Sequence, residues 1–166
     1  MRDDVSGLRT LLLRGADPNV RDKDGNTPLY VALREPALAV AAQLIEYRAT
    51  QVDARNKTDE TPLMMASLRG QLDMVKKLIE RGADVNKTGW TPLHYAATRS
   101  HDEIVNLLLE EHAYIDAESP NGTTPLMMAA FLLKYVKLIP IRRVSDRWTS
   151  ITLTRSCTSC GPATRI

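Results

Sequence analysis

At 166 residues, with 43% hydrophobic and 25% charged residues, the chain has the composition of an ordinary folded domain with a sizeable core. No run reaches the roughly 18 apolar residues of a membrane-spanning helix, so we expect no membrane span. After Pro140 the chain contains five arginines and one aspartate, whereas the rest of the chain holds 17 basic and 19 acidic residues. A weakly acidic body lacks the basic face typical of nucleic-acid binders, and we expect no nucleic-acid partner.

The first predicted element is a helix over residues 4–13, followed by Gly15-Ala16-Asp17-Pro18-Asn19. Related segments end at Asp53, Asn86 and Asp116, and each lies shortly before a Thr-Pro-Leu tripeptide, at 61–63, 91–93 and 124–126. With the first copy at 27–29, the tripeptides are spaced by 34, 30 and 33 residues. One known helical array has a period of about 33 residues. Four linked copies of two motifs indicate an internal repeat.

Each Thr-Pro-Leu predicts the start of a short inner helix. The threonine can cap the helix, and proline suits the first helical position, where its missing N–H costs nothing. The four predicted caps are Thr27, Thr61, Thr91 and Thr124. Small alanines inside these helices, such as Ala96, allow a neighbouring repeat to approach closely.

An outer helix is predicted after each of the two middle inner helices, from apolar residues at helical spacing. These residues are Met74, Val75, Leu78 and Ile79 in one copy, and Ile104, Val105, Leu107 and Leu108 in the next. Gly82 suits a helix end because glycine readily adopts positive φ. Turn sequences at 22–26 and 119–122 predict the tips between units. Neither helix of a unit buries its apolar face alone, so stacking must supply the core.

These motifs resemble the ankyrin-repeat family, whose pattern contains T-P-L-H-x-A-A-x-x-G-H-x-x-I-V and ends in G-A-D-V-N. The best match runs from Gly89 to Asp116, and the resemblance covers about residues 4–130. It implies an all-α solenoid of helix-turn-helix repeats with β-hairpin or loop tips. We divide the chain into a partial repeat at 1–21, full repeats at 22–55, 56–86 and 87–117, a divergent repeat at 118–139 and a basic tail at 140–166, which can form a strand or remain disordered.

The chain departs from this pattern at several places. The partial first repeat lacks an inner helix, which suggests a fragment, and the third unit is short before Gly89, which predicts a clipped tip. Tyr30 and Met64 replace the histidine that follows Thr-Pro-Leu, which puts the hydrogen bond of that histidine in question there. Beyond Ala130 no turn separates two helices. A divergent cap and an altered, out-of-register C-terminus both explain that change.

The resemblance implies a binding surface on the concave side, made of tip turns and the exposed ends of the inner helices. We call this surface the strip. Counted from the family pattern, it contains Lys23, Asp24, Asn26, Arg34, Glu35, Lys57, Thr58, Glu60, Leu68, Arg69, Thr88, Trp90, Thr98 and Arg99.

Trp90 is the strip residue most suited to anchor a partner, because tryptophan offers the large rigid area that dominates interfaces. Packing against the neighbouring hairpin is an equally supported role for it. Four residues at one equivalent position, Val31, Met65, Tyr95 and Met128, could line a ligand groove. Packing between repeats is the favoured interpretation of this set, because methionine is a soft filler of cores.

The sequence contains no motif typical of a catalytic site, and we expect neither a cofactor nor a metal. His94 and His101 lie where the family uses structural histidines. Cys157 and Cys160 form a single Cys-x-x-Cys, whereas zinc needs about four ligands. Both cysteines lie in the tail, so the body needs no disulfide, which favours a cytoplasmic location.

We therefore expect a non-enzymatic module that binds a protein through the strip. An accessory module or fragment of a larger enzyme, channel or effector is the alternative function. The partial first repeat also predicts self-association through uncapped ends, because Leu8, Leu11 and Leu12 are left partly uncovered.

Overall fold

The computed structural model describes residues 4–133, and every helix named below lies in that range. The bounds are α1 Val5–Leu13, α2 Pro28–Arg34, α3 Leu38–Glu46, α4 Pro62–Arg69, α5 Leu72–Glu80, α6 Pro92–Thr98, α7 Asp102–Glu110 and α8 Pro125–Leu133. The chain divides into a unit of Met1–Leu132 and a second of Leu133–Ile166. The basic tail, its cysteine pair and residues 134–139 of the divergent repeat lie outside the described residues.

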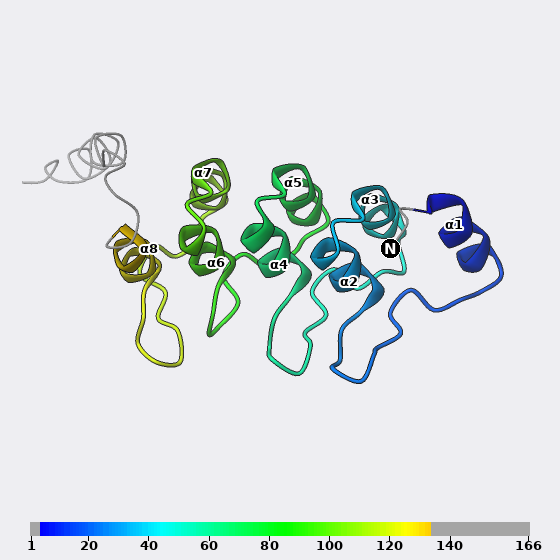
Figure 1. Ribbon diagram of the computed structural model, residues 1–166, viewed down its shortest axis with the longest axis horizontal. Helices are drawn as coiled ribbons and strands as arrows, with labels where there is room; N and C mark the ends of the chain where they lie inside the picture. The colour runs from blue at the N-terminus through cyan, green and yellow to red at the C-terminus, as the bar shows by residue number, and fades with distance from the viewer. Residues whose placement is uncertain (1–3, 134–166) are drawn as a thin grey trace, which may run out of the picture. The chain divides into compact units, whose positions relative to one another are not determined.

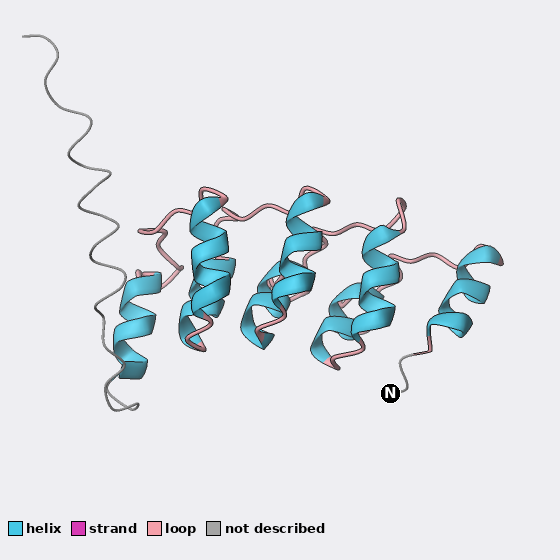
Figure 2. Cartoon of the chain, turned by 90° about the horizontal axis from the view of Figure 1, so that it is seen from above, coloured by secondary structure: helices cyan, strands magenta, loops and turns pink. Residues whose placement is uncertain are grey.

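The helices form two rows, which confirms the all-α helix-turn-helix solenoid. The inner row contains α2, α4, α6 and α8, and the outer row contains α1, α3, α5 and α7 (Figures 1 and 2). Outer helix α1 contacts α3, and no inner helix accompanies it among the described residues (Figure 1). No helix in the described range is long and apolar enough to cross a bilayer.

Three of the four predicted threonine caps are present, whereas the Thr91 hydroxyl before α6 accepts no hydrogen bond from the helix backbone. The hydroxyl oxygens of Thr27, Thr61 and Thr124 accept hydrogen bonds from backbone N–H groups three residues later, at 3.4, 3.3 and 3.3 Å. Proline follows each of these threonines at the first helical position. Gly82, just after α5, has a φ of 84°, so the predicted helix end is confirmed.

The core is one continuous apolar seam between the rows. Leu29, Leu63 and Leu93, the leucines of the first three Thr-Pro-Leu motifs, are almost fully buried. The outer helices complete the seam with Leu44, Leu78 and Leu108. Each buried leucine side chain contributes about 1.5–3 kcal/mol relative to an exposed one. Stacking therefore supplies the core that no single unit contains.

The asparagines that end two of the four Gly-Ala-Asp-type segments tie one repeat to the next. The Asn19 amide donates to the Ala49 carbonyl at 2.8 Å and accepts from the Gln51 N–H at 2.7 Å. Asn86 makes the same pair of bonds with His112 and Tyr114. In these two copies the asparagine satisfies backbone groups that the neighbouring loop would otherwise leave unpaired.

The tip loops are tight turns, and no strand is present in the described part of the chain. Asp22 N–H donates to the Asn26 carbonyl at 3.0 Å, Asn56 N–H to the Glu60 carbonyl at 3.1 Å, and Ser119 N–H to the Thr123 carbonyl at 3.0 Å. The loop before α6 is visibly shorter than the loops before α2, α4 and α8 (Figure 1). The clipped tip predicted near Gly89 is therefore present.

Candidate functional site

The strip residues lie on the tip loops and at the C-terminal ends of α2, α4 and α6, and they differ widely in exposure. Eight of them are exposed: Lys23, Asp24, Glu35, Lys57, Thr58, Arg69, Thr88 and Arg99. Five are half-buried: Arg34, Glu60, Leu68, Trp90 and Thr98. One, Asn26, is buried.

Asn26 is a structural residue of the first tip, and its assignment as an outward strip residue is wrong. Its side-chain amide donates to Asp22 at 2.9 Å, and its carbonyl oxygen accepts from Asn56 at 3.1 Å. Only 5% of the residue is exposed. Asp22 also accepts the Asn26 backbone N–H, and these bonds, the side-chain bond first, lower the pKa of the Asp22 carboxyl. A side chain bonded on both sides of a loop cannot also face a partner.

Glu60 is the centre of a polar network that joins three repeats. Its carboxylate accepts from the Tyr30 hydroxyl at 2.6 Å and from the Tyr95 hydroxyl at 3.1 Å. It also accepts from the Asn56 amide at 3.1 Å and the Thr58 hydroxyl at 3.0 Å. The two tyrosines come from α2 and α6, and Glu60 lies two residues before α4. The network therefore fixes three inner helices relative to one another at the strip.

Burial by itself raises the pKa of the Glu60 carboxyl, but the hydrogen bonds, led by that from Tyr30, outweigh burial and lower the pKa. Burial, followed by the hydrogen bond to Glu60 and its negative charge, raises the pKa of Tyr30 far above the usual range. For Tyr95, burial comes first and the charge of Glu60 second, with the same direction. Glu60 thus stays ionised and both hydroxyls stay protonated, which is the state in which all these bonds form.

Sequence reasoning missed this network, although its three main residues were each noticed. The sequence identifies Tyr30 as a replacement for the family's histidine, Tyr95 as a residue that packs between repeats and Glu60 as an outward-facing residue. Packing at the Tyr95 position is partly right, since Tyr95 is half-buried and its equivalent Met65 is only 7% exposed. The signal that could have found the network is the spacing, because Tyr30, Glu60 and Tyr95 lie 30 and 35 residues apart.

Three arginines follow the C-terminal ends of the inner helices. Arg69 donates to the Arg34 carbonyl at 2.7 Å, and Arg34 pairs with Glu35 at 3.3 Å. Arg99, the C-cap of α6, is exposed and forms no salt bridge with any described residue. Two of the three charges are thus partly engaged within the chain, whereas Arg99 is exposed and forms no ion pair with a described residue.

Trp90 stands just before α6 on the clipped tip. Its ring meets the His94 ring edge to face, with centroids 5.3 Å apart and planes at 76°. The residue is half-buried, so part of the indole packs and part remains on the surface. Leu68 packs against the core, and the Thr98 hydroxyl donates to the His94 carbonyl at 2.7 Å. These contacts hold this part of the strip rigid.

His94 and His101 form bonds within the stack. One ring nitrogen of His94, Nε2, lies 2.9 Å from the Thr123 carbonyl, so it must carry the proton that it donates. The other, Nδ1, then accepts from Thr91 N–H at 3.2 Å. His101 Nε2 lies 3.2 Å from the Leu68 carbonyl. Both histidines connect repeats, as the family resemblance implies.

Tyr30 and Met64 replace the family's histidine, and the hydrogen bond of that histidine has a different fate at each residue. The sulfur of Met64 accepts from Thr61 N–H at 3.4 Å, so this helix keeps a weak version of the histidine bond. The Tyr30 hydroxyl instead reaches Glu60 in the next repeat. In the described range no group of three or more His, Cys, Asp or Glu side chains could hold a metal ion.

Comparison with known proteins agrees with this architecture. A model of ankyrin repeats in three copies matches residues 2–89 and 85–140. The chain is 40% identical over 82 residues to alpha-latrocrustotoxin-Lt1a of Latrodectus tredecimguttatus, 42% over 79 residues to human neurogenic locus notch homolog protein 4 and 42% over 81 residues to pig NF-kappa-B inhibitor alpha.

Each of these alignments covers a little under half of this chain: 49%, 48% and 46%. They cover only 6%, 4% and 26% of the three relatives, so the likeness extends to a short stretch of each. The family model, by contrast, spans most of the chain, including every described helix. The chain therefore belongs to the ankyrin-repeat family.

Proposed function

We propose that this chain is a protein-binding module whose contact surface is the strip, with Trp90 and Arg99 at its centre. The observation that carries the proposal is the Tyr30–Glu60–Tyr95 network, which joins three inner helices beneath an otherwise polar, partly exposed surface. A surface that is already ordered loses little conformational entropy on binding.

The remaining strip residues supply the chemistry of recognition. Lys23, Lys57 and Arg99 are exposed cations, and Trp90 offers an aromatic surface beside Arg99's helix. Tryptophan and arginine are the residues enriched at energetic centres of interfaces. Asn26 is excluded from the proposed contact set, and Glu60 acts from beneath it as a positioning residue.

Binding without catalysis is the proposed role, and neither a cofactor nor a nucleic acid is part of it. The side chains of His94, His101 and Glu60 are engaged in bonds between repeats, so none of these three is poised as a general base toward a cavity. A role as an accessory module of a larger enzyme, channel or effector is compatible with the same surface, because the relatives extend far beyond the aligned stretch.

A second proposed property is self-association through the ends of the stack. Leu11 and Leu13 on α1 are 55% and 82% exposed, and Leu126 and Met127 on α8 are 74% and 57% exposed. Apolar side chains gathered at both ends are typical of contact surfaces.

The strip is tested by capturing a partner from a cell extract with the full chain as bait, and by repeating the capture with Trp90→Ala/Arg99→Ala. The matched control is Tyr114→Ala/Lys76→Ala, which also removes one exposed aromatic residue and one cation, but away from the strip. We expect the strip variant to lose the partner and the control to keep it, with both melting within a few degrees of wild type. Capture retained by the strip variant would place the contact elsewhere.

A further inference from the structure

Two inner helices of this chain begin with the same six residues but lie in different surroundings. The sequence Thr-Pro-Leu-Met-Met-Ala occupies 61–66 at α4 and 124–129 at α8. In α4 every one of these residues is buried, with Leu63 at 0% and Met64 at 1% exposure. In α8 the equivalent Leu126 and Met127 are 74% and 57% exposed. The leucine and the first methionine of this sequence are thus core residues in α4 and exposed residues in α8.

The opposite end of the stack presents a groove beside α1 and α2. Outer helix α1 packs on α3, but the place of an inner helix beside it holds a groove of about 480 Å³. The lining is mostly apolar and includes Leu8, Pro28, Val31, Ala32, Val40 and Leu44. This groove lies where the next inner helix would stand in the row α2, α4, α6 and α8 (Figures 1 and 2).

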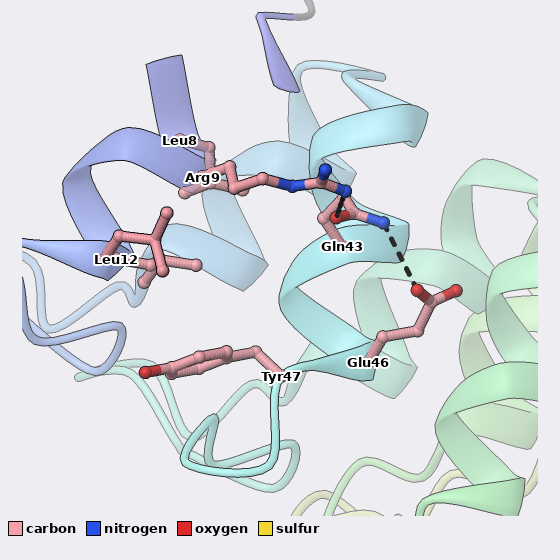
Figure 3. Close-up of a pocket in the computed structure, with 7 residues that line it drawn as sticks. Leu8, Arg9, Leu12, Gln43, Glu46 and Tyr47 are labelled. Atoms are coloured by element: carbon pink, nitrogen blue, oxygen red, sulfur yellow. Dashed lines mark hydrogen bonds between the residues drawn. The ribbon is translucent and has the colours of Figure 1, made fainter. Parts of the chain in front are cut away.

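Hydrogen bonds around a second pocket, which Leu12 and Tyr47 also line, hold α1 against α3 (Figure 3). Arg9 donates to the Gln43 side chain at 3.2 Å, and Gln43 donates to Glu46 at 3.2 Å (Figure 3). Glu46 in turn pairs with Lys77 on α5 at 3.0 Å. This series of bonds runs along the outer row and holds α1 in the register of an outer helix, although no inner helix accompanies it among residues 4–133.

We propose that α8 of one copy docks into the groove beside α1 and α2 of a second copy, so that the two chains together form one complete ankyrin repeat. This inference deepens the proposed self-association by naming the two surfaces that meet. The occupant is identified by its sequence, since α8 carries the same six residues that α4 buries between α2 and α6. α8 also leaves uncovered the leucine and the methionine that α4 buries.

The docked helix would meet two surfaces that an inner helix meets inside the stack. Its Leu126 and Met127 would pack toward α1, which acts as the outer helix that α8 lacks among the described residues. The neighbouring face of α8 would lie along Val31 and Ala32 of α2. Both sides of the contact are apolar, so docking removes exposed hydrocarbon from water on each copy.

The contact is head-to-tail, because a groove on one copy receives a helix from another. A docked pair still presents one free groove, on one copy, and one free α8, on the other, so association continues into short chains of copies. A contact of one patch with itself would instead stop at a dimer. This difference makes the proposal testable by stoichiometry.

The experiment is sedimentation velocity on the full chain across a range of concentrations, with reductant present so that Cys157 and Cys160 cannot cross-link copies. Two variants each block one surface: Val31→Glu in the groove and Met127→Glu on α8. Ile115→Glu, which charges an apolar residue exposed elsewhere in the described structure, is the matched control. Circular dichroism and thermal melting establish that every variant is folded.

We expect wild type and Ile115→Glu to form dimers and longer species as concentration rises, and each blocked variant alone to remain monomeric. An equimolar mixture of Val31→Glu and Met127→Glu should form a one-to-one dimer and nothing longer, since one intact groove meets one intact helix. A wild-type monomer at every concentration overturns the proposal. So does a folded blocked variant that still associates as wild type does, or a mixture that stays monomeric.

The outcome is independent of the strip. Trp90→Ala/Arg99→Ala should associate as wild type does, and Val31→Glu should still capture a partner. A variant that loses capture but still associates has therefore lost the strip. A variant that loses association but still captures a partner has lost the composite repeat.

Discussion

Two junctions between neighbouring repeats use the same helix position with different chemistry. The third residue of α2, Tyr30, reaches the carboxylate of Glu60, the second residue before α4. The third residue of α6, His94, reaches the carbonyl of Thr123, the second residue before α8. The first junction depends on an ionised carboxylate and the second on a neutral imidazole. The comparison teaches that a repeat scaffold fixes where neighbours are joined but not which groups join them.

The largest expected effect is the loss of the histidine junction. His94→Ala removes a side chain that is 1% exposed, leaves Thr91 N–H without its acceptor and frees the Thr123 carbonyl. Cavity formation and unpaired buried groups together should lower the free energy of unfolding by about 3 kcal/mol. Urea unfolding measures it. A loss below about 1 kcal/mol would show that the junction contributes little.

The tyrosine junction should respond less to a single deletion. Tyr30→Phe keeps the ring and removes only the hydroxyl, and three other donors still reach Glu60. We expect a loss of about 1 kcal/mol, because the remaining donors and water compensate in part. Urea unfolding beside Tyr95→Phe provides the comparison, and nuclear magnetic resonance titration should show the Glu60 pKa rising in the Tyr30 variant. An unchanged Glu60 pKa would contradict the assigned hydrogen bond.

The smallest expected effect is a difference between the two junctions in how their contribution to stability depends on pH. Burial lowers the pKa of His94 below its ordinary 6.5, so the unfolded state binds the proton first as pH falls. The stability that the neutral ring contributes is therefore full above about pH 6.5 and declines as pH falls below it. The Glu60 pKa is lowered from 4.5, so its contribution is full above that value and declines only in more acidic solution.

Hydrogen exchange as a function of pH detects this order. Amides of α6 and the tip at 119–123 should lose protection at a higher pH than those of α2 and the tip at 56–60. His94→Gln is the control, since glutamine does not titrate and should remove the first decline. Simultaneous loss of protection at both junctions would contradict the separation.

Most of the fold was predictable because each element is encoded locally. A capping threonine, a proline at the first helical position and a glycine at the helix end each act through their own backbone. Because these signals recur in four copies of the repeat, they also predict how the helices are arranged along the chain. The clipped tip near Gly89 was predictable for the same reason, as a departure from the common length.

The site was less predictable because it depends on contacts between repeats. Asn26 is polar and lies on a tip, yet the Asn56 amide from the next tip binds it and closes it off. Glu60 is recessed because two tyrosines from different helices meet its carboxylate. Side chains 30 residues apart meet only once the stack sets the distance between neighbouring units. A pattern of surface positions taken from a family cannot contain bonds that are particular to this chain.

Hydrogen exchange of the chain alone and with its captured partner tests the central claim, recognition through the strip, most directly. We predict slower exchange on binding in the tips at 22–26, 56–60 and 87–90 and at the C-terminal ends of α4 and α6, with no change in α5 or α7. Protection confined to the outer helices, with unchanged exchange in the tips, would contradict the account.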